Sequence, residues 1–186
     1  PEGPFIPFKE KLPATPLDQM ALDGTLWVED GVPYMVYCHE WVQVTDGAIG
    51  YVRLKQDLSD LDGEPKNLFR ASYVNHTWGK PIPPDGSGYV TDGPYLLKGK
   101  TGKLYMIWTT NNSCGIAISD SGKIAGPWRQ QDTALLTDAG HGMIFKTFEG
   151  KIILCLHTPY WGETYPKLFE LEDTGETLRV VGPYGK

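Results

Sequence analysis

The sequence predicts an all-β protein whose short strands form the blades of a β-propeller. Three observations support this fold class: the composition, a segment pattern that recurs three times, and the lack of a long stretch with the apolar periodicity of an amphipathic helix. The 186 residues include 22 glycines and 15 prolines, and 12% of them are aromatic. Frequent turn formers and many flat side chains are typical of short antiparallel strands. Glycine or proline interrupts nearly every window in which an amphipathic helix could form.

The recurring segment begins with an ionisable residue and a glycine, followed by a short apolar strand, a turn with glycine and a second apolar strand. Its three copies read LDGTLWVEDGVPYMVY (22–37), TDGPYLLKGKTGKLYMIW (91–108) and GHGMIFKTFEGKIILCLH (140–157). From Asp23, Asp92 and His141 to the turn glycine, the spacing is 8, 10 and 9 residues. Such near-regular spacing predicts three two-stranded hairpins.

Each hairpin is followed by another candidate strand, in GAIGYVRL (47–54), CGIAISD (114–120) and KLFELED (167–173). The units start near residues 22, 91 and 140, and the Pro/Gly-rich stretch 71–90 accounts for most of the uneven spacing. Units of four short antiparallel strands that recur at about 40–50 residues are typical of propeller blades. We therefore expect residues 1–186 to form one partial propeller domain with about three blades. A β-sandwich is the alternative architecture.

Asp23, Asp92 and His141 hold the same place in the three repeats. In a propeller, the first strand of each blade lines the central channel, so we expect these three side chains to converge on one axis. A single carboxylate before a strand would more simply cap a turn. Three ionisable groups are costly to gather inside a fold without a purpose. The repeat therefore predicts a functional site on the axis.

Together with SDSGKIAGPW (119–128), these segments closely resemble glycoside hydrolase family 43 over nearly the whole chain. The resemblance implies a five-bladed β-propeller that cleaves arabinofuranosyl or xylosyl linkages in plant polysaccharide with inversion. It also implies that the chain holds the last three blades. The general base would then lie in missing N-terminal blades, and these blades or a second chain would complete the ring.

The resemblance also implies roles for individual residues. Asp23 matches the aspartate that orients the general acid and tunes its pKa, and Asp92 matches the position of the acid itself. The family acid is usually glutamate, one methylene longer than aspartate, so Glu40 in YCHEWVQ is the alternative acid. His141 matches a histidine beside the channel. No cofactor is required, but His141 is expected either to lie near a structural Ca²⁺ or another ion, or to be a hydrogen-bonded channel residue.

Sugar-binding sites combine aromatic rings with side-chain hydrogen-bond donors. A large aromatic side chain that is exposed in a loop often marks a binding site. We therefore expect sugar contacts from Trp41, Trp78 and Trp161, with His39 donating to hydroxyl groups. Further candidates for sugar contacts are His76 and Tyr160. Trp27 and Trp108 stand in strands and are expected to fill space between blades.

Charge and composition limit the kinds of partner and the cellular location that we expect for this protein. The net charge of −6 and the pI near 5.2 argue against nucleic acid. No apolar run approaches the roughly 20 residues of a membrane span. The chain shows no signal peptide, but a polysaccharide substrate implies a secreted or periplasmic protein. The three widely spaced cysteines lack a CxxC motif, so we expect reduced, buried side chains.

Two other functions compete with hydrolysis of arabinose- or xylose-containing glycans. A non-catalytic glycan-binding propeller would fit the shortened acid at Asp92 and the missing base. A fructan or levan hydrolase would place its glutamate acid in an EC context, and that pair of residues does not occur in the sequence.

Overall fold

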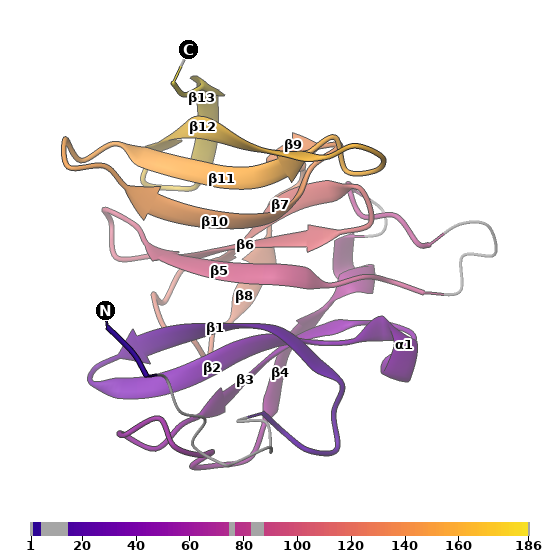
Figure 1. Ribbon diagram of the computed structural model, residues 1–186, viewed down its shortest axis with the longest axis vertical. Helices are drawn as coiled ribbons and strands as arrows, with labels where there is room; N and C mark the ends of the chain where they lie inside the picture. Colours follow the sequence, from indigo (N-terminus) through magenta and orange to yellow (C-terminus); the bar gives the residue numbers. More distant parts are fainter. Residues whose placement is uncertain (1, 5–14, 75–76, 83–87, 186) are drawn as a thin grey trace.

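The computed structural model describes residues 2–4, 15–74, 77–82 and 88–185 and arranges their strands in three antiparallel sheets (Figure 1). The first sheet has the order β1 (Ala21–Glu29), β2 (Val32–His39), β3 (Ala48–Arg53), β4 (Lys66–Arg70). The second has the order β5 (Asp92–Lys98), β6 (Leu104–Thr110), β7 (Ser113–Ser119), β8 (Trp128–Gln130), and β9 (Leu136–Thr137) also pairs with β7. The third has the order β10 (Gly140–Lys146), β11 (Ile152–Thr158), β12 (Tyr165–Asp173), β13 (Leu178–Pro183).

These sheets are three successive blades of a β-propeller, as the repeat predicts. Each blade is a meander in sequence order, and its first strand lies at one edge of the sheet. β5 lies beside both β1 and β10, so the first strands of the three blades form a common inner side (Figure 1). They begin at Ala21, Asp92 and Gly140, close to the expected starts. Because three separate sheets follow one another, the β-sandwich alternative is wrong.

Two apolar clusters, one on each side of the middle blade, hold the blades together. Every residue of β6 and β7 is buried, because this sheet has a neighbour on both faces. Along β6 the side chains alternate as a pleated strand requires. Leu104, Met106 and Trp108 pack against the first blade, whereas Tyr105 and Ile107 pack against the third. Trp108 therefore fills space between blades, as expected.

Trp78 also belongs to this core, so the prediction that it contacts sugar is wrong. Its side chain is 7% exposed and its ring centroid lies 5.1 Å from that of Trp108. The indole N–H donates to the Gln131 carbonyl at 2.9 Å. A Cβ at Gly115 would lie only 2.1 Å from the Trp78 ring, so the glycine makes room for it. Burying a large ring with its N–H satisfied stabilises the fold more than exposing it would.

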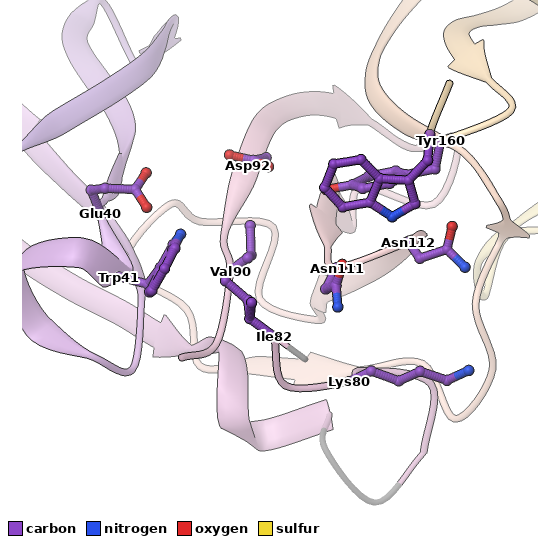
Figure 2. Close-up of a pocket in the computed structure, with 10 residues that line it drawn as sticks. Glu40, Trp41, Lys80, Ile82, Val90, Asp92, Asn111, Asn112 and Tyr160 are labelled. Carbon is purple, nitrogen blue, oxygen red and sulfur yellow. The ribbon is translucent and has the colours of Figure 1, made fainter. Parts of the chain in front are cut away.

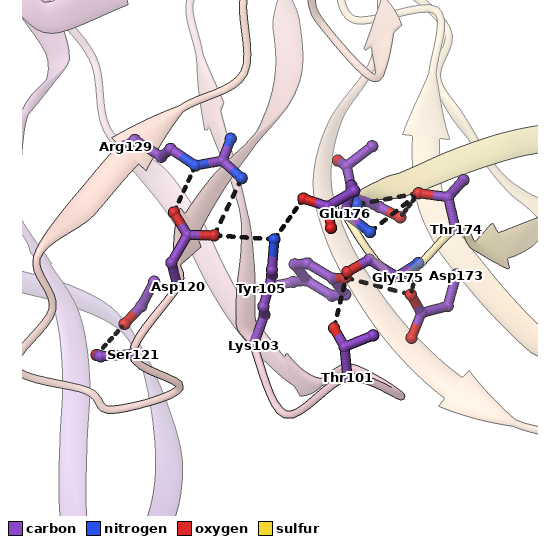
Figure 3. A network of polar contacts seen from close by, with 12 residues as sticks. Thr101, Lys103, Tyr105, Asp120, Ser121, Arg129, Asp173, Thr174, Gly175 and Glu176 are labelled. Carbon is purple, nitrogen blue, oxygen red and sulfur yellow. Dashed lines mark hydrogen bonds and ion pairs between the residues drawn. The ribbon is translucent and has the colours of Figure 1, made fainter.

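Polar side chains in turns also join the second and third blades (Figure 3). Lys103, before β6, forms ion pairs with Asp120 at 3.1 Å and with Glu176 of the third blade. The Tyr105 hydroxyl donates to Asp173 at 3.2 Å. The acidic partners of Lys103 are largely exposed, so water screens both pairs and they contribute little to stability. Their effect is to fix how the two blades face each other.

Helical structure in the described ranges is limited to α1 (Trp41–Val44) and a 3₁₀ turn, η1 (Ala71–Val74). Within those ranges, no helix has the length and apolar character needed to cross a membrane. Among the cysteines, Cys38 and Cys114 are buried and Cys155 is partly buried, and all three are free thiols.

Candidate active site

A β-bulge interrupts the first half of each inner strand. The last residues paired before the bulge are Leu22, Asp92 and Gly140, and pairing resumes at Thr25, Tyr95 and Met143. The first bulged residue has a positive φ in every blade: 54° at Asp23, 49° at Gly93 and 50° at His141. Asp23 and His141 are thus equivalent, but Asp92 stands one residue earlier. The prediction that all three share one place in the repeat is wrong for Asp92.

Gly93 is the true counterpart of Asp23 and His141. Counted from the positive-φ residue, the spacing to the turn glycine in the second blade falls from 10 to 9 (102 − 93). A Cβ at Gly93 would lie 3.0 Å from Cδ2 of His141 and 3.2 Å from its Cα. Glycine is therefore required here both by backbone conformation and by the close approach of the third blade.

Despite this offset, the structure brings Asp23, Asp92 and His141 together. One ligand atom from each lies within 4.8 Å of the other two. His141 Nε2 lies 3.0 Å from Asp23 Oδ2, and the Gly93 N–H donates to the same oxygen at 3.4 Å. The backbone N–H of His141 donates to Thr109 Oγ1 at 3.0 Å, and Thr109 is the strand partner of Asp92. All three blades therefore contribute to one polar cluster.

The environment of Asp92 favours its protonated form. Burial raises the pKa of this carboxyl from 3.8 to about 6. The protonated His141 acts in the opposite direction, while the negative charges of Asp23 and Glu40 and a hydrogen bond with Asp23 raise the pKa further. When two carboxyl groups share a hydrogen bond, one of them must carry the proton. Below about pH 6 that group is Asp92, which then donates to Asp23.

Asp23 and His141 form a charged pair beside it. The hydrogen bond from His141 lowers the pKa of Asp23 below its ordinary value, against an opposing effect of burial. The same bond raises the pKa of His141 above 6.5. The two shifts agree in direction, so an imidazolium–carboxylate pair is favoured near neutral pH. Its two charges act on the pKa of Asp92 in opposite directions.

A cavity of about 610 Å³ opens beside this cluster, within the usual range for small-ligand sites. Figure 2 shows Glu40 and Trp41 on one side, Tyr160 on the other and Asp92 between them. Apart from Asp92, most of the lining comes from the loop between the second and third strands of each blade. The lining residues are Glu40, Trp41, Lys80, Ile82, Val90, Asp92, Asn111, Asn112, Tyr160 and Trp161.

Glu40 is a second carboxyl group on the wall of this cavity. It follows β2 directly, and only 7% of its surface is exposed. Burial raises its pKa above 4.5, whereas the backbone N–H groups of Val42 and Trp41 oppose that shift. Among the described residues, none forms an ion pair with Glu40.

The residues predicted to bind sugar have different positions. Trp41 and Trp161 line the cavity, and Trp161 is 70% exposed. His39 is not among the lining residues, and its Nε2 forms a hydrogen bond with Gln43 Oε1 at 2.8 Å. His76 lies outside the described residues.

Sequence reasoning missed Asn111 and Asn112, in the turn between β6 and β7. The Asn111 side chain donates to the Pro81 carbonyl at 3.1 Å, and the buried Asn112 Oδ1 finds no hydrogen-bond partner among the described residues. Their counterparts in the other blades are the loops that hold Glu40 and Tyr160. That shared place in the repeat was the signal that could have identified them.

The three clustered side chains do not by themselves fit a calcium site. Calcium takes six to eight oxygen ligands. The cluster offers two carboxylates and an imidazole, and the Nε2 of that imidazole is already paired with Asp23. The described geometry instead favours the hydrogen-bonded role of His141, and the ion remains a prediction.

Fold and site together define a β-propeller with a carboxyl-lined pocket at the inner side of its blades. Residues 1–169 match the model of the glycosyl hydrolases family 43, and the chain belongs to this family. No curated protein matches the chain significantly.

Among solved structures, an endo-arabinase from Bacteroides thetaiotaomicron VPI-5482 is similar at 35% identity with a TM-score of 0.84, covering 91% of this chain and 62% of its own. A thermostable family-43 glycoside hydrolase matches at 20% identity and TM-score 0.77, covering 92% of this chain and 61% of its own. An endo-1,4-beta-xylanase from Bacteroides thetaiotaomicron VPI-5482 matches at 21% identity and TM-score 0.73, covering 94% of this chain and 62% of its own. The last two support the fold alone. The chain spans about three fifths of the length of these proteins.

Proposed function

We propose that the complete protein is a glycoside hydrolase that cleaves arabinofuranosyl or xylosyl linkages in plant polysaccharide. The observation that carries this proposal is the pair of carboxyl groups of Asp92 and Glu40, whose pKa values are raised by burial, at a cavity large enough for a sugar. Membership of family 43 and similarity to a protein described as an endo-arabinase support the same substrate class.

The proposed reaction proceeds with inversion at the anomeric carbon. Inverting hydrolysis needs one protonated carboxyl to give its proton to the leaving group and one carboxylate to activate water on the other face of the sugar. Asp92 and Glu40 are the candidates for the first role, since burial raises the pKa of both. We assign the second role to a carboxylate outside the described residues, because the chain spans only 62% of the endo-arabinase.

Substrate binding would combine stacking with hydrogen bonds. Trp41 of the first blade and Trp161 of the third blade offer apolar ring faces to the C–H face of a sugar. The side chains of Asn111, Asn112 and Lys80 supply donors and acceptors at the same cavity. A few directed polar groups within a largely apolar lining are typical of specific small-ligand pockets.

Because polysaccharides do not enter cells, we also propose that the protein acts in the periplasm or outside the cell. Fractionation of the producing cell tests this proposal. Activity found mainly in the cytoplasmic fraction would argue against it.

The test of activity uses the full-length protein with 4-nitrophenyl α-L-arabinofuranoside and β-D-xyloside. Release of 4-nitrophenol from either compound supports the proposal. If arabino- or xylo-oligosaccharides bind but neither they nor the aryl glycosides are cleaved, the protein is a non-catalytic glycan-binding propeller. Fructose release from levan, without release from the aryl glycosides, would indicate a fructan hydrolase.

A further inference from the structure

Glu40 and Asp92 face the same cavity from different blades but differ in their hydrogen-bonding environment. Asp92 belongs to the cluster with Asp23 and His141, in which ligand atoms lie within 4.8 Å of one another. Its carboxyl proton is shared with Asp23, which is itself paired with His141 at 3.0 Å. A proton that Asp92 donates to Asp23 is not available at the same time to a group in the cavity.

Glu40 lies outside that cluster. Its side chain points from the wall of the first blade toward the cavity (Figure 2). The residue is largely buried, and among the described residues no cation pairs with its carboxyl group. Desolvation raises the pKa of this carboxyl and so favours its neutral form, against the opposing effect of the backbone N–H groups of Val42 and Trp41. In that form its O–H is available to a group inside the cavity.

We propose that Glu40 is the general acid of this site and that Asp92, Asp23 and His141 act as a positioning cluster beside it. This inference rests on the proposed function. The Glu40 O–H gives its proton to the glycosidic oxygen while the bond from that oxygen to the anomeric carbon breaks. The bonding electron pair stays with the leaving oxygen, which departs as an alcohol. A water molecule attacks the anomeric carbon and loses its proton to the general base, and Glu40 is reprotonated by solvent.

A structural role for Glu40 makes a different prediction. The carboxylate precedes α1, where the backbone N–H groups of Trp41 and Val42 act on it, so it could simply stabilise this turn. Removing a turn-stabilising group would lower activity equally on all substrates. Removing a general acid matters only when the leaving group needs a proton. The dependence on the leaving group therefore separates the two roles.

The experiment compares Glu40→Gln, Asp92→Asn and Glu149→Gln in the full-length protein. Glu149 is fully exposed in the turn between β10 and β11 and serves as the control for loss of a carboxylate. The substrates are an arabino-oligosaccharide, whose leaving group needs a proton, and 2,4-dinitrophenyl α-L-arabinofuranoside, whose leaving group does not. The matching xylo-compounds are used if the wild-type protein prefers xylose.

For Glu40→Gln, kcat/KM on the oligosaccharide should fall about 100-fold or more, but less than about tenfold on the dinitrophenyl glycoside. Asp92→Asn should lower both by similar factors, and Glu149→Gln should lower neither. Equal losses on both substrates in Glu40→Gln, or a leaving-group dependence confined to Asp92→Asn, would overturn the assignment and leave the proposed function intact. A wild-type protein inactive on every substrate would overturn both.

Glu40→Asp provides a second variant if Glu40→Gln fails to fold. It keeps the carboxyl but retracts it by one methylene. It should therefore lose activity on the oligosaccharide and keep it on the dinitrophenyl glycoside. Unchanged oligosaccharide activity in Glu40→Asp together with a loss on both substrates in Asp92→Asn would also count against Glu40 as the acid.

Discussion

His141 Nε2 lies 3.0 Å from Asp23 Oδ2, which joins the third blade to the first at the inner side of the sheets. The N–H of Gly93, from the blade between them, donates to the same oxygen at 3.4 Å. Each residue occupies the first bulged position of its inner strand. The bulge therefore places one contact from every blade at a single point, and Asp92 lies directly beside it.

Asp23→Asn and His141→Gln should shift the pKa of Asp92 in opposite directions. The Asp23 charge and its hydrogen bond raise this pKa, whereas the His141 charge lowers it. The decrease in Asp23→Asn should be small, because His141 also loses its proton more easily once its partner is neutral. NMR titration of proteins labelled with ¹³C at the aspartate carboxyl measures both shifts. Shifts in the same direction in the two variants would show that Asp92 does not sense the pair as described.

Asp92→Asn should stabilise the protein at neutral pH but not in acid. The folded-state pKa of about 6 lies above the ordinary value of 3.8, so the folded protein keeps a proton that the unfolded chain has lost. Stability from this group is present below about pH 4 and is lost as the pH rises through about 6. Asparagine cannot ionise, so the variant does not lose this stability, which amounts to at most about 3 kcal/mol at pH 7.

Urea denaturation of wild type and Asp92→Asn at pH 4 and pH 7 measures this difference. A gain in unfolding free energy that is equal at the two pH values would point to packing instead of ionisation. Asn also donates to Asp23, so the hydrogen bond itself is expected to persist in the variant.

Trp78→Ala and Trp161→Ala should have opposite consequences. Trp78 is buried against Trp108, so its loss should lower the free energy of unfolding by about 3–5 kcal/mol. Trp161 is exposed at the cavity, so its loss should leave stability within about 0.5 kcal/mol and raise KM. Denaturation curves and steady-state kinetics on the two variants check this. A stability loss in Trp161→Ala as large as that in Trp78→Ala would contradict the structure.

Gly93→Ala should destabilise the protein more than Gly102→Ala. Both glycines have a positive φ, at 49° and 85°, so alanine is strained at each by about 1–2 kcal/mol. A Cβ at Gly102 meets no atom within 4 Å, whereas one at Gly93 meets the His141 ring at 3.0 Å. Because both variants carry the backbone strain, the difference between their thermal denaturation midpoints reports the contact of the new Cβ with the His141 ring. Equal losses would mean that the third blade does not approach Gly93 this closely.

The repeat in the sequence was sufficient to predict the three blades and the gathering of Asp23, Asp92 and His141. It could not reveal the offset at Asp92, because both Asp23 and Asp92 precede a glycine. Matching the two Asp-Gly pairs in the sequence therefore pairs Asp23 with Asp92. The position of the bulge in each strand instead pairs Asp23 with Gly93.

Burial was the second property that the sequence did not show. Trp78 lies in a Pro/Gly-rich loop, which predicts exposure, but Gly115 leaves a space that the indole fills. Conversely, nothing in the sequence singled out Asn112, and Glu40 stood only as the alternative acid, since each residue lies in a short loop next to a strand. Their importance comes from the cavity, which forms only when loops from three blades meet.

The most direct test of a sugar-cleaving site at the inner side of these blades is ¹H NMR of the first product formed by the full-length protein. An α-L-arabinofuranoside is hydrolysed in the NMR tube, and the anomeric signal of the released sugar is followed before mutarotation. We expect the β-anomer to appear first and both Glu40→Gln and Asp92→Asn to slow its appearance. Initial formation of the α-anomer, or no hydrolysis of any arabinosyl or xylosyl substrate, would contradict this expectation.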